Sequence, residues 1–353
     1  MNIVHISIVF PIFVPKQLTI TIMKRTWVPK NINDVLFPVE VRPVLYVDNN
    51  GHTKFIPQNK AIVDPRTSYT FAVVSRSYRL ITNREAYEIA DYIIRGVFPG
   101  LTLKDFVVFN IYMPKTKGSC RVDLIRPHTF ENPFGDETEQ WTPFVRITNS
   151  YNKTFLLKYE IGFCRWICLN GVIFGQKGVT VAFNHTEITK KDLDEIIEKA
   201  IKQIGNIRNL WSAFEKKLKR LKDITIPESL ALAMFCKAFG IVIKDEKKLK
   251  PNQIESLGIK AKQIVRISKD YFDELGNNAY AIFNVLTDFA SFPEGTTNFN
   301  NYVHSYQRKV GDWVDDLIKE YDKEGYSHYK YIGEDAMNTA FILEALIKRE
   351  KES

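Results

Sequence analysis

The stretch from residue 143 to 186 constrains the fold of this chain most, because it holds β-rich runs separated by strong turn signals. It reads PFVRITNSYNKTFLLKYEIGFCRWICLNGVIFGQKGVTVAFNHT. We predict strands at Phe144–Thr148 and Thr154–Asn170, with a bulge or bend at Gly162 in the second. Within it, alternation would put Arg165, Ile167 and Leu169 on one face and Cys164, Trp166 and Cys168 on the other. Asn170-Gly171 then predicts a sharp turn into a third run.

Sheet signals also precede this stretch. Residues 39–82 alternate strand and turn patterns, and Asn50-Gly51 is a strong hairpin signal. Thr82 or Asn83 is suited to cap a helix that starts at Arg84 and carries an apolar face. Residues 106–125 then read as a β-hairpin with the tip sequence PKTKGS. The first half is therefore predicted to be a mostly antiparallel, curved sheet with one helix near residues 84–95.

The hydrophobic period changes from two to 3.6 after Thr186. Thr189 and Asp192 resemble a capping box. An apolar stripe then continues to Leu221, as one long helix or as two that meet near Gly205. The remaining segments also have helical periodicity. The predicted fold class is α+β, with a β-rich basic domain at 23–188 and a helical region at 189–353 packed on the sheet.

The first 22 residues are open to more than one interpretation. Their apolar run is broken by Pro11, lacks a basic leader region and is too short to span a bilayer. Met23 is a plausible start, which would make residues 1–22 an over-called extension of the chain, whereas Met1 would add an edge strand or a weak anchor. We expect no membrane association.

Positive charge is concentrated in the first half of the chain. Residues 1–188 carry 22 Lys and Arg against 15 Asp and Glu, so +7 of the net charge of +8 lies there. This distribution favours a polyanionic partner for the β-rich half. A basic surface without a specific partner explains it equally well.

Six side chains are candidates for contact with nucleic acid. The hairpin tip and its flank supply cations for phosphates, and strand rings could stack on bases. Arg165 lies in an apolar strand, where it must either pair with an acid or face an anion-binding groove. The candidates are Lys115, Lys117, Arg121, Arg165, Tyr151 and Trp166.

Catalytic and metal-binding motifs are not recognisable in the sequence. It has no nucleotide-binding glycine motif, no HExxH, no GxSxG and no paired CxxC. The four cysteines form no secreted-type framework, which points to a reducing cytoplasm. Cys164 and Cys168 would lie about 13 Å apart on a strand, too far to share one zinc ion. We therefore predict no metal, no cofactor and no catalytic residues.

Three groups of motifs carry a resemblance to a known family. They lie in VVSRSYRLITNREAYE, in the TNS turn and in RWICLNG. With these the chain resembles the phage/plasmid-like family called domain of unknown function 932, over roughly residues 69–321. The matching positions are Ser75, Tyr78, Asn83, Glu85, Ala86, Thr148, Asn149, Ser150, Arg165, Cys168, Asn170 and Gly171. The N-terminal extension and the acidic loop at 127–142 depart from the family pattern.

The resemblance implies a mobile-element setting and a role in DNA metabolism, and it supplies no catalytic residues. The leading hypothesis is a non-enzymatic protein that binds or anneals single-stranded DNA. A protein–protein module, such as an anti-defence or assembly factor, is one alternative, and an unrecognised nucleotide-processing enzyme is another. The basic half and the long helix would also suit a homo-oligomer.

Overall fold

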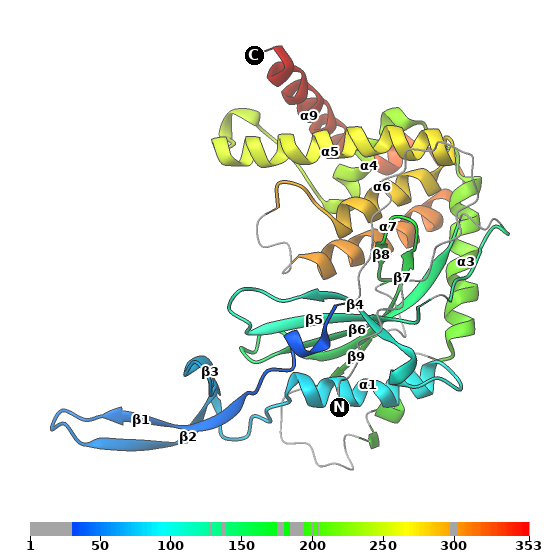
Figure 1. Ribbon diagram of the computed structural model, residues 1–353. Coiled ribbons are helices and arrows are strands. Elements are labelled where there is room, and N and C mark those ends of the chain that lie inside the picture. The colour runs from blue at the N-terminus through cyan, green and yellow to red at the C-terminus, as the bar shows by residue number, and fades with distance from the viewer. Residues whose placement is uncertain are drawn as a thin grey trace, which may run out of the picture.

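A central antiparallel sheet joins a projecting β arm to a helical half (Figure 1). The computed structural model describes residues 30–127, 129–135, 139–174, 180–183, 194–195, 197–199, 201–202, 205–296 and 302–352. Residues 1–22 and the proposed capping box at Thr189 and Asp192 lie outside these ranges. Within them, the fold is α+β, as predicted from the sequence.

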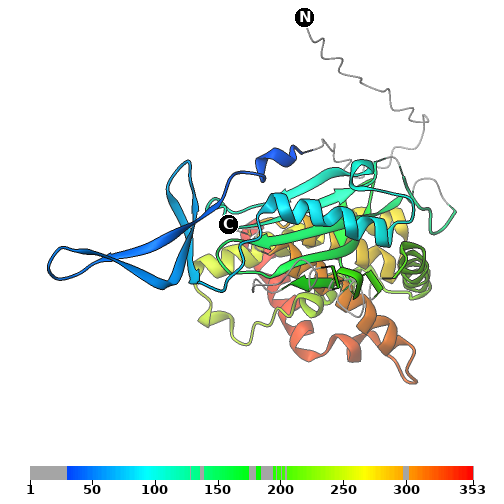
Figure 2. The same cartoon turned by 90° about the horizontal axis from the view of Figure 1, so that it is seen from below.

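The arm is a three-stranded antiparallel sheet of order β1-β2-β3. Its strands are β1 (Glu40–Val47), β2 (Thr53–Asp64) and β3 (Tyr69–Ser75). The turn at Asn50-Gly51 joins β1 to β2, as predicted, with Gly51 at a φ of +83°. Figures 1 and 2 show that the β1–β2 ribbon extends away from the rest of the molecule. A short 3-10 helix, η1 (Ile32–Asp34), precedes the arm.

The described strands of the central sheet follow the order β4-β5-β6-β7-β8, with β9 also paired to β7. They are β4 (Val107–Tyr112), β5 (Ser119–Ile125), β6 (Trp141–Ser150), β7 (Leu157–Arg165), β8 (Asn170–Val172) and β9 (Thr180–Phe183). All pairings are antiparallel. The predicted β4–β5 hairpin is therefore confirmed.

The end of β7 differs from its sequence-based prediction. The strand stops at Arg165, the chain turns over residues 166–169, and β8 returns so that Arg165 lies opposite Asn170. The predicted alternation of faces beyond Arg165 is therefore wrong, and so is the predicted sharp turn at Asn170-Gly171, because both residues lie in β8. Leu169 adopts a φ of +58° in this turn. Ile, Cys and Leu give no turn signal, and a left-handed leucine is costly enough that only the surrounding structure can impose it.

Gly162 is neither a bulge nor a bend. The β6–β7 register runs without a shift past the pair formed by Phe144 and Gly162. A Cβ atom at Gly162 would overlap the Phe144 ring and would lie 2.7 Å from the carbonyl oxygen of Val172. Glycine is needed at this position because the Phe144 ring lies too close to β7 to leave room for a Cβ atom.

Helix α1 (Asn83–Val97) covers one face of the central sheet. Thr82 caps it by accepting a hydrogen bond from the N–H of Glu85, as the sequence predicted. Its apolar side packs against the inward side chains of β5, β6 and β7, including Val122, Val145 and Ile161. A 3-10 turn, η2 (Leu103–Asp105), leads from the helix to β4.

The helical half covers the β7–β8 side of the sheet (Figure 1). It contains α3 (Ile207–Asp223), η3 (Glu228–Leu230), α4 (Ala231–Phe239), η4 (Glu246–Lys248), α5 (Pro251–Leu275), α6 (Ala279–Ser291), α7 (Val303–Tyr321), α8 (His328–Ile332) and α9 (Glu334–Glu352). Its core includes Trp141, Phe163 and Val172 of the sheet. Gly205, at a φ of +72°, separates α3 from helical residues before it, so the predicted stripe forms two helices. No helix among the described residues is long and apolar enough to cross a membrane.

Candidate nucleic-acid interface

The β1–β3 arm presents aromatic rings to solvent. Tyr46 is 47% exposed, Phe55 53% and Tyr69 48%. Tyr46 lies opposite Lys54 in the β1–β2 register, so this ring and this ammonium group share one face of the ribbon. Leu45 and Phe55 form a neighbouring cross-strand pair on the other face. Exposed rings beside cations are what a surface needs to stack on unpaired bases.

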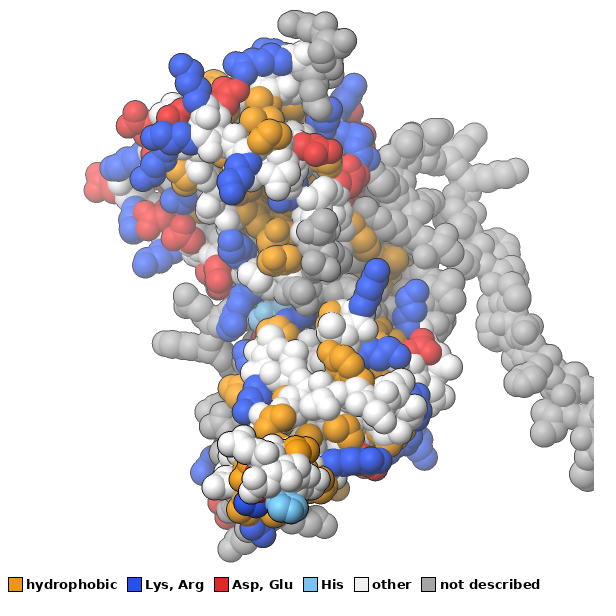
Figure 3. Space-filling view, turned by 90° about the vertical axis from the view of Figure 1, so that its left-hand side faces the viewer, with side chains coloured by type: hydrophobic (Ala, Val, Ile, Leu, Met, Phe, Trp, Pro, Cys, Tyr) orange, Lys and Arg blue, Asp and Glu red, His pale blue; other side chains and the backbone are white. Residues whose placement is uncertain are grey.

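The free end of the arm carries one acidic side chain, Asp48, whose carboxylate lies 3.0 Å from the Lys54 ammonium. Figure 3, which looks at the molecule from the side on which the arm projects, shows hydrophobic and basic side chains mixed over the arm and the sheet. Acidic side chains gather instead over the helical half in the same view. The electrostatic asymmetry of the sequence is therefore visible on this face.

The tip of the β4–β5 hairpin reaches the base of the arm. The Lys117 ammonium lies 5.6 Å from the centroid of the Phe37 ring, and the Arg66 guanidinium lies 5.5 Å from the same centroid. Hydrogen bonds from Arg66 lower the pKa of Asp64, and the charge of Lys117 adds to this effect. Lys115 and Lys117 are both exposed. The tip lysines and the arm therefore form one surface, which we call the arm surface.

Arg121 lies away from the arm surface and inside the protein. Its side chain is 4% exposed, and its guanidinium lies 4.2 Å from the centroid of the Phe155 ring. Burial lowers the pKa of Arg121 to about 10, and the nearby charge of Arg146 contributes in the same direction. A phosphate contact by Arg121 on the outer surface, as expected from the hairpin sequence, does not agree with this position.

Arg121 belongs to a row of charged residues on the face of the sheet opposite α1. The β4–β7 register places it beside Asp123, Arg146 and Glu160, all of them at most 4% exposed. Arg146 donates two hydrogen bonds of 2.6 Å to the two carboxylate oxygens of Asp123. This charged face is buried, and ion pairing compensates part of the cost of desolvation.

His304 of α7 closes the charged face from the helical side. Its Nε2 lies 2.9 Å from Oε1 and 2.8 Å from Oε2 of Glu160. Burial lowers the pKa of His304 although Glu160 opposes the effect. Burial also opposes ionisation of Glu160, yet the hydrogen bond to His304 and the charge of Arg146 leave its pKa lowered overall. A neutral imidazole that donates to a carboxylate is consistent with both directions.

Arg165 forms the internal ion pair, which was one of its two predicted roles. It donates hydrogen bonds of 3.0 and 2.7 Å to Glu139 and one of 2.7 Å to Glu274. Tyr280 donates a hydrogen bond of 2.8 Å to the same Glu139 carboxylate. Arg165 is fully buried, so the geometry leaves no groove for an external anion at this side chain.

Tyr151 is not positioned to stack on bases. It is 1% exposed, and its hydroxyl accepts a hydrogen bond of 2.8 Å from the backbone N–H of Asn83. Burial raises its pKa. Trp166 is half-buried, with Phe109 and Phe130 against its ring at centroid distances of 6.5 and 5.0 Å. The arm rings Tyr46, Phe55 and Tyr69, by contrast, are each about half exposed.

The motif residues Asn83 and Asn149 join α1 to the sheet. Asn149 donates through Nδ2 to the carbonyl of Ile81 and to Oδ1 of Asn83, at 3.0 and 2.9 Å. Asn83 in turn donates to the carbonyl of Val35 at 2.9 Å. Ser150 donates to the carbonyl of Phe155 at 2.8 Å. These buried amides hold backbone groups that would otherwise lack partners.

The motif residues Ser75, Tyr78 and Glu85 lie between the end of β3 and the first turn of α1. Glu85 accepts a hydrogen bond of 2.6 Å from Arg79. The Ser75 hydroxyl lies 3.1 Å from that of Ser77, and burial raises the pKa of Tyr78 to about 12. These contacts are local and position the entry to α1.

The motif residues Asn170 and Gly171 join the sheet to the helical half. Asn170 donates a hydrogen bond of 2.9 Å to the Tyr271 hydroxyl, which donates to Asp288 at 3.0 Å. The backbone N–H of Gly171 donates to Ser291 at 2.9 Å. Cys168 is buried in the same region, and burial raises the pKa of its thiol. The motif residues therefore connect the sheet to α1 on one side and to the helical half on the other.

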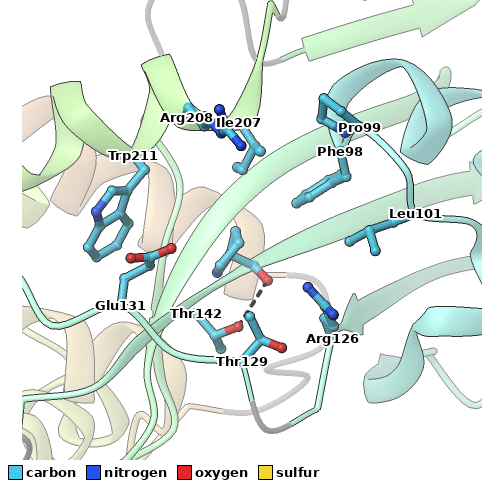
Figure 4. Close-up of a pocket in the computed structure, with 11 residues that line it drawn as sticks. Phe98, Pro99, Leu101, Arg126, Thr129, Glu131, Thr142, Ile207, Arg208 and Trp211 are labelled. Carbon is cyan, nitrogen blue, oxygen red and sulfur yellow. Dashed lines mark hydrogen bonds between the residues drawn. The ribbon is translucent and has the colours of Figure 1, made fainter.

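A cavity of about 220 Å³ opens where α1, α3 and the start of β6 meet. Figure 4 shows Trp211 and Glu131 at one end of it, and Phe98, Leu101 and Arg126 at the other. Arg208, in the first turn of α3, also lines the cavity (Figure 4). Among the described residues, no group of His, Cys, Asp and Glu could hold a metal ion.

Sequence reasoning missed the arm rings and His304. Tyr46 and Phe55 lie in the two strands that flank the Asn50-Gly51 turn, and the residue pattern of these strands alternates. This pattern indicates a hairpin, and one short segment of chain cannot cover both faces of a hairpin. His304 had no comparable signal, because its partner Glu160 is 144 residues away in the chain. Only the packing of α7 against the sheet brings the two together.

Comparison with family models confirms the resemblance found from the motifs. Residues 124–294 match the family described as Domain of unknown function (DUF932). The matched range contains Asn149, Arg165 and Asn170, and it starts after Ser75 and Asn83. Comparison with the curated proteins and with the solved structures found no match. The family description names no activity.

Proposed function

We propose that this protein binds single-stranded nucleic acid on its arm surface, without catalysing a reaction. The observation that carries the proposal is that Tyr46 and Phe55 are about half exposed on the β1–β2 ribbon that projects from the molecule, with Tyr69 similarly exposed at the start of β3. The tip lysines Lys115 and Lys117 lie at the base of that ribbon. A mobile-element protein, as the family resemblance implies, would meet such single strands.

Single strands fit this surface better than a duplex does. A ring can stack only on a base whose face is free, and base–aromatic stacking contributes about 1–3 kcal/mol per base. The cations would contact the backbone, and phosphate neutralisation releases counterions. Binding should therefore weaken steeply with salt, and a duplex should compete poorly.

Fluorescence anisotropy of a labelled oligonucleotide at two salt concentrations tests the proposal. Tyr46→Ala and Phe55→Ala should each weaken binding by roughly 5-fold to 100-fold, following the energy of a stacked base. Tyr329→Ala is the matched control, because this ring is 64% exposed on α8 and lies outside the arm surface. Lys115→Gln with Lys117→Gln should flatten the salt dependence. Equal affinities of the wild type and the arm variants would refute the proposal.

A protein partner is the second candidate function, favoured by one further observation. Leu45 is 55% exposed, Val47 66% and Phe55 53%, and they share one face of the ribbon. Such an apolar face is typical of contacts between proteins, including two copies of one chain. Light scattering at two protein concentrations tests self-association. Leu45→Thr with Val47→Thr should reduce the measured mass if the face pairs two copies, whereas a monomer at both concentrations would exclude that pairing.

A further inference from the structure

The cavity between α1, α3 and β6 has the features of a site for a planar anionic ligand. Two aromatic side chains, Phe98 and Trp211, contribute to its lining, as do two arginines, Arg126 and Arg208. Ligand sites are typically apolar clefts with a few converging polar groups. Glu131 is the carboxylate of the lining, so that cations predominate in it.

The aromatic part of the lining is held in place by the core. Trp211 packs against Phe163 in a tilted arrangement at a centroid distance of 5.8 Å and edge-on against Phe214 at 5.6 Å. Phe98 packs edge-on against Phe106 at 5.2 Å. These contacts order both rings before any ligand arrives, which lowers the entropic cost of binding.

The two arginines are available for an anion. Both Arg126 and Arg208 are exposed. Neither lies within salt-bridge distance of a carboxylate in the part of the chain that the structure describes, although the charge of Arg126 helps to lower the pKa of Asp105. Guanidinium groups recognise phosphate through paired hydrogen bonds. Arg208 stands in the first turn of the 17-residue helix α3, whose N-terminus also favours negative charge.

Polar groups between the rings would read a base edge. Thr142 is buried at the start of β6, and Thr129 and Glu131 lie on the loop before it. The Thr142 and Thr129 hydroxyls donate to the carbonyl oxygens of Pro143 and Pro127 at 3.5 Å. Their oxygens can accept, as the carboxylate can, which suits the donor groups of a nucleobase edge. A planar ring between apolar walls and a phosphate at the guanidinium groups would use the whole cavity.

We propose that this cavity binds one nucleotide, with the base near Trp211 and Phe98 and the phosphate at Arg126 and Arg208. The choice of a nucleotide among planar anions rests on the proposed nucleic-acid function. The elements that line the cavity, the C-terminal end of α1 and the start of α3, lie at the other end of the central sheet from the arm (Figures 1 and 2). The two sites can therefore be tested separately.

Isothermal titration of the full-length protein with dAMP and dTMP tests this site. The nucleoside monophosphates should bind more tightly than deoxyadenosine, thymidine or inorganic phosphate alone. Arg126→Gln and Arg208→Gln should each weaken binding roughly 10-fold, as expected for loss of a charge-assisted hydrogen bond. Arg266→Gln is the control, because Arg266 is an exposed arginine on α5 that lies outside the cavity.

A cavity-filling variant gives a second readout. Leu101→Trp should abolish nucleotide binding while leaving the melting temperature nearly unchanged, since Leu101 is only half-buried. Binding that survives both Leu101→Trp and the arginine substitutions would overturn the inference, as would equal affinity for nucleosides and their monophosphates.

The two proposals fail in different ways. Oligonucleotide binding lost in Tyr46→Ala with mononucleotide binding retained would support both sites. Mononucleotide binding without any oligonucleotide binding would support the cavity and reject the arm proposal. Oligonucleotide binding without mononucleotide binding would reject the cavity proposal alone.

Discussion

At the scale of single residues, the buried polar side chains of this protein mainly connect one element of the fold to another. Arg165 is buried with two carboxylates, and Asn149 spans from β6 to the start of α1. Buried ionic groups seldom add net stability, but removal of one partner leaves the other without compensation. Their loss should therefore affect folding before it affects binding.

Arg165→Met should lower the free energy of unfolding by about 3–5 kcal/mol, because Glu139 and Glu274 would remain buried without their cation. Urea denaturation measures the change. Arg266→Met is the control, since its pair with Glu294 is exposed and should contribute at most about 1 kcal/mol. Equal effects of the two substitutions would contradict the role assigned to Arg165.

Tyr151→Phe should destabilise the fold by about 1–3 kcal/mol, because the buried N–H of Asn83 would lose its acceptor. Thermal unfolding detects this change, and anisotropy should show unaltered oligonucleotide affinity at a temperature where the variant is folded. Weaker binding with unchanged stability would instead return Tyr151 to the interface predicted from the sequence.

At the scale of elements, glycine is required where two parts of the fold lie too close together for a Cβ atom. Helix α7 lies so close to the residue after β8 that a Cβ atom at Gly311 would overlap the carbonyl oxygen of Ile173 and lie 2.9 Å from its carbonyl carbon. The same logic applies to Gly162 beneath Phe144. In both places a glycine stands in a regular element where local propensity disfavours it.

Gly311→Ala should therefore destabilise the protein, although alanine favours a helix by about 1 kcal/mol over glycine. Overpacking against backbone atoms typically costs about 1–3 kcal/mol, so we expect a net loss in chemical denaturation. Lys319→Ala, at an exposed position of the same helix, should change stability by less than about 0.5 kcal/mol. A stabilised Gly311→Ala variant would show that α7 does not lie this close to β8.

At the scale of the whole molecule, the charged face links the sheet to the helical half through Glu160 and His304. The pKa of His304 is lowered in the folded state, so the unfolded chain binds its proton first as the pH falls. Stability from this group is complete above its unfolded pKa near 6.5 and decreases as the pH falls below that value. The lowered pKa of Glu160 acts in the same direction at lower pH, beginning near its unfolded value of 4.5.

His304→Gln should reduce the loss of stability between pH 7 and 5.5, and the difference from the wild type should stay below about 1.4 kcal/mol per pH unit, the limit for one proton. Urea midpoints across this range measure it. His52→Gln is the control, because this imidazole lies on the exposed turn of the arm. Parallel pH profiles of the wild type and His304→Gln would exclude a role for this histidine in the pH dependence.

The sequence by itself determined the local elements of this protein. Asn50-Gly51 predicted the turn of the arm, Thr82 the start of α1, and the spacing of apolar residues the helical half, because turn chemistry, capping and periodicity act within a few residues. It also showed that positive charge is concentrated in the β-rich half.

Only the tertiary structure decided which side chains face solvent. Lys117 and Arg121 lie four residues apart, yet one is exposed at a tip and the other is buried on the charged face. Alternation assigns side chains to the two faces of a strand but does not say which face another element covers. The arm remains uncovered and α7 covers Glu160 because of contacts between residues that are distant in the chain, and local patterns do not contain that information.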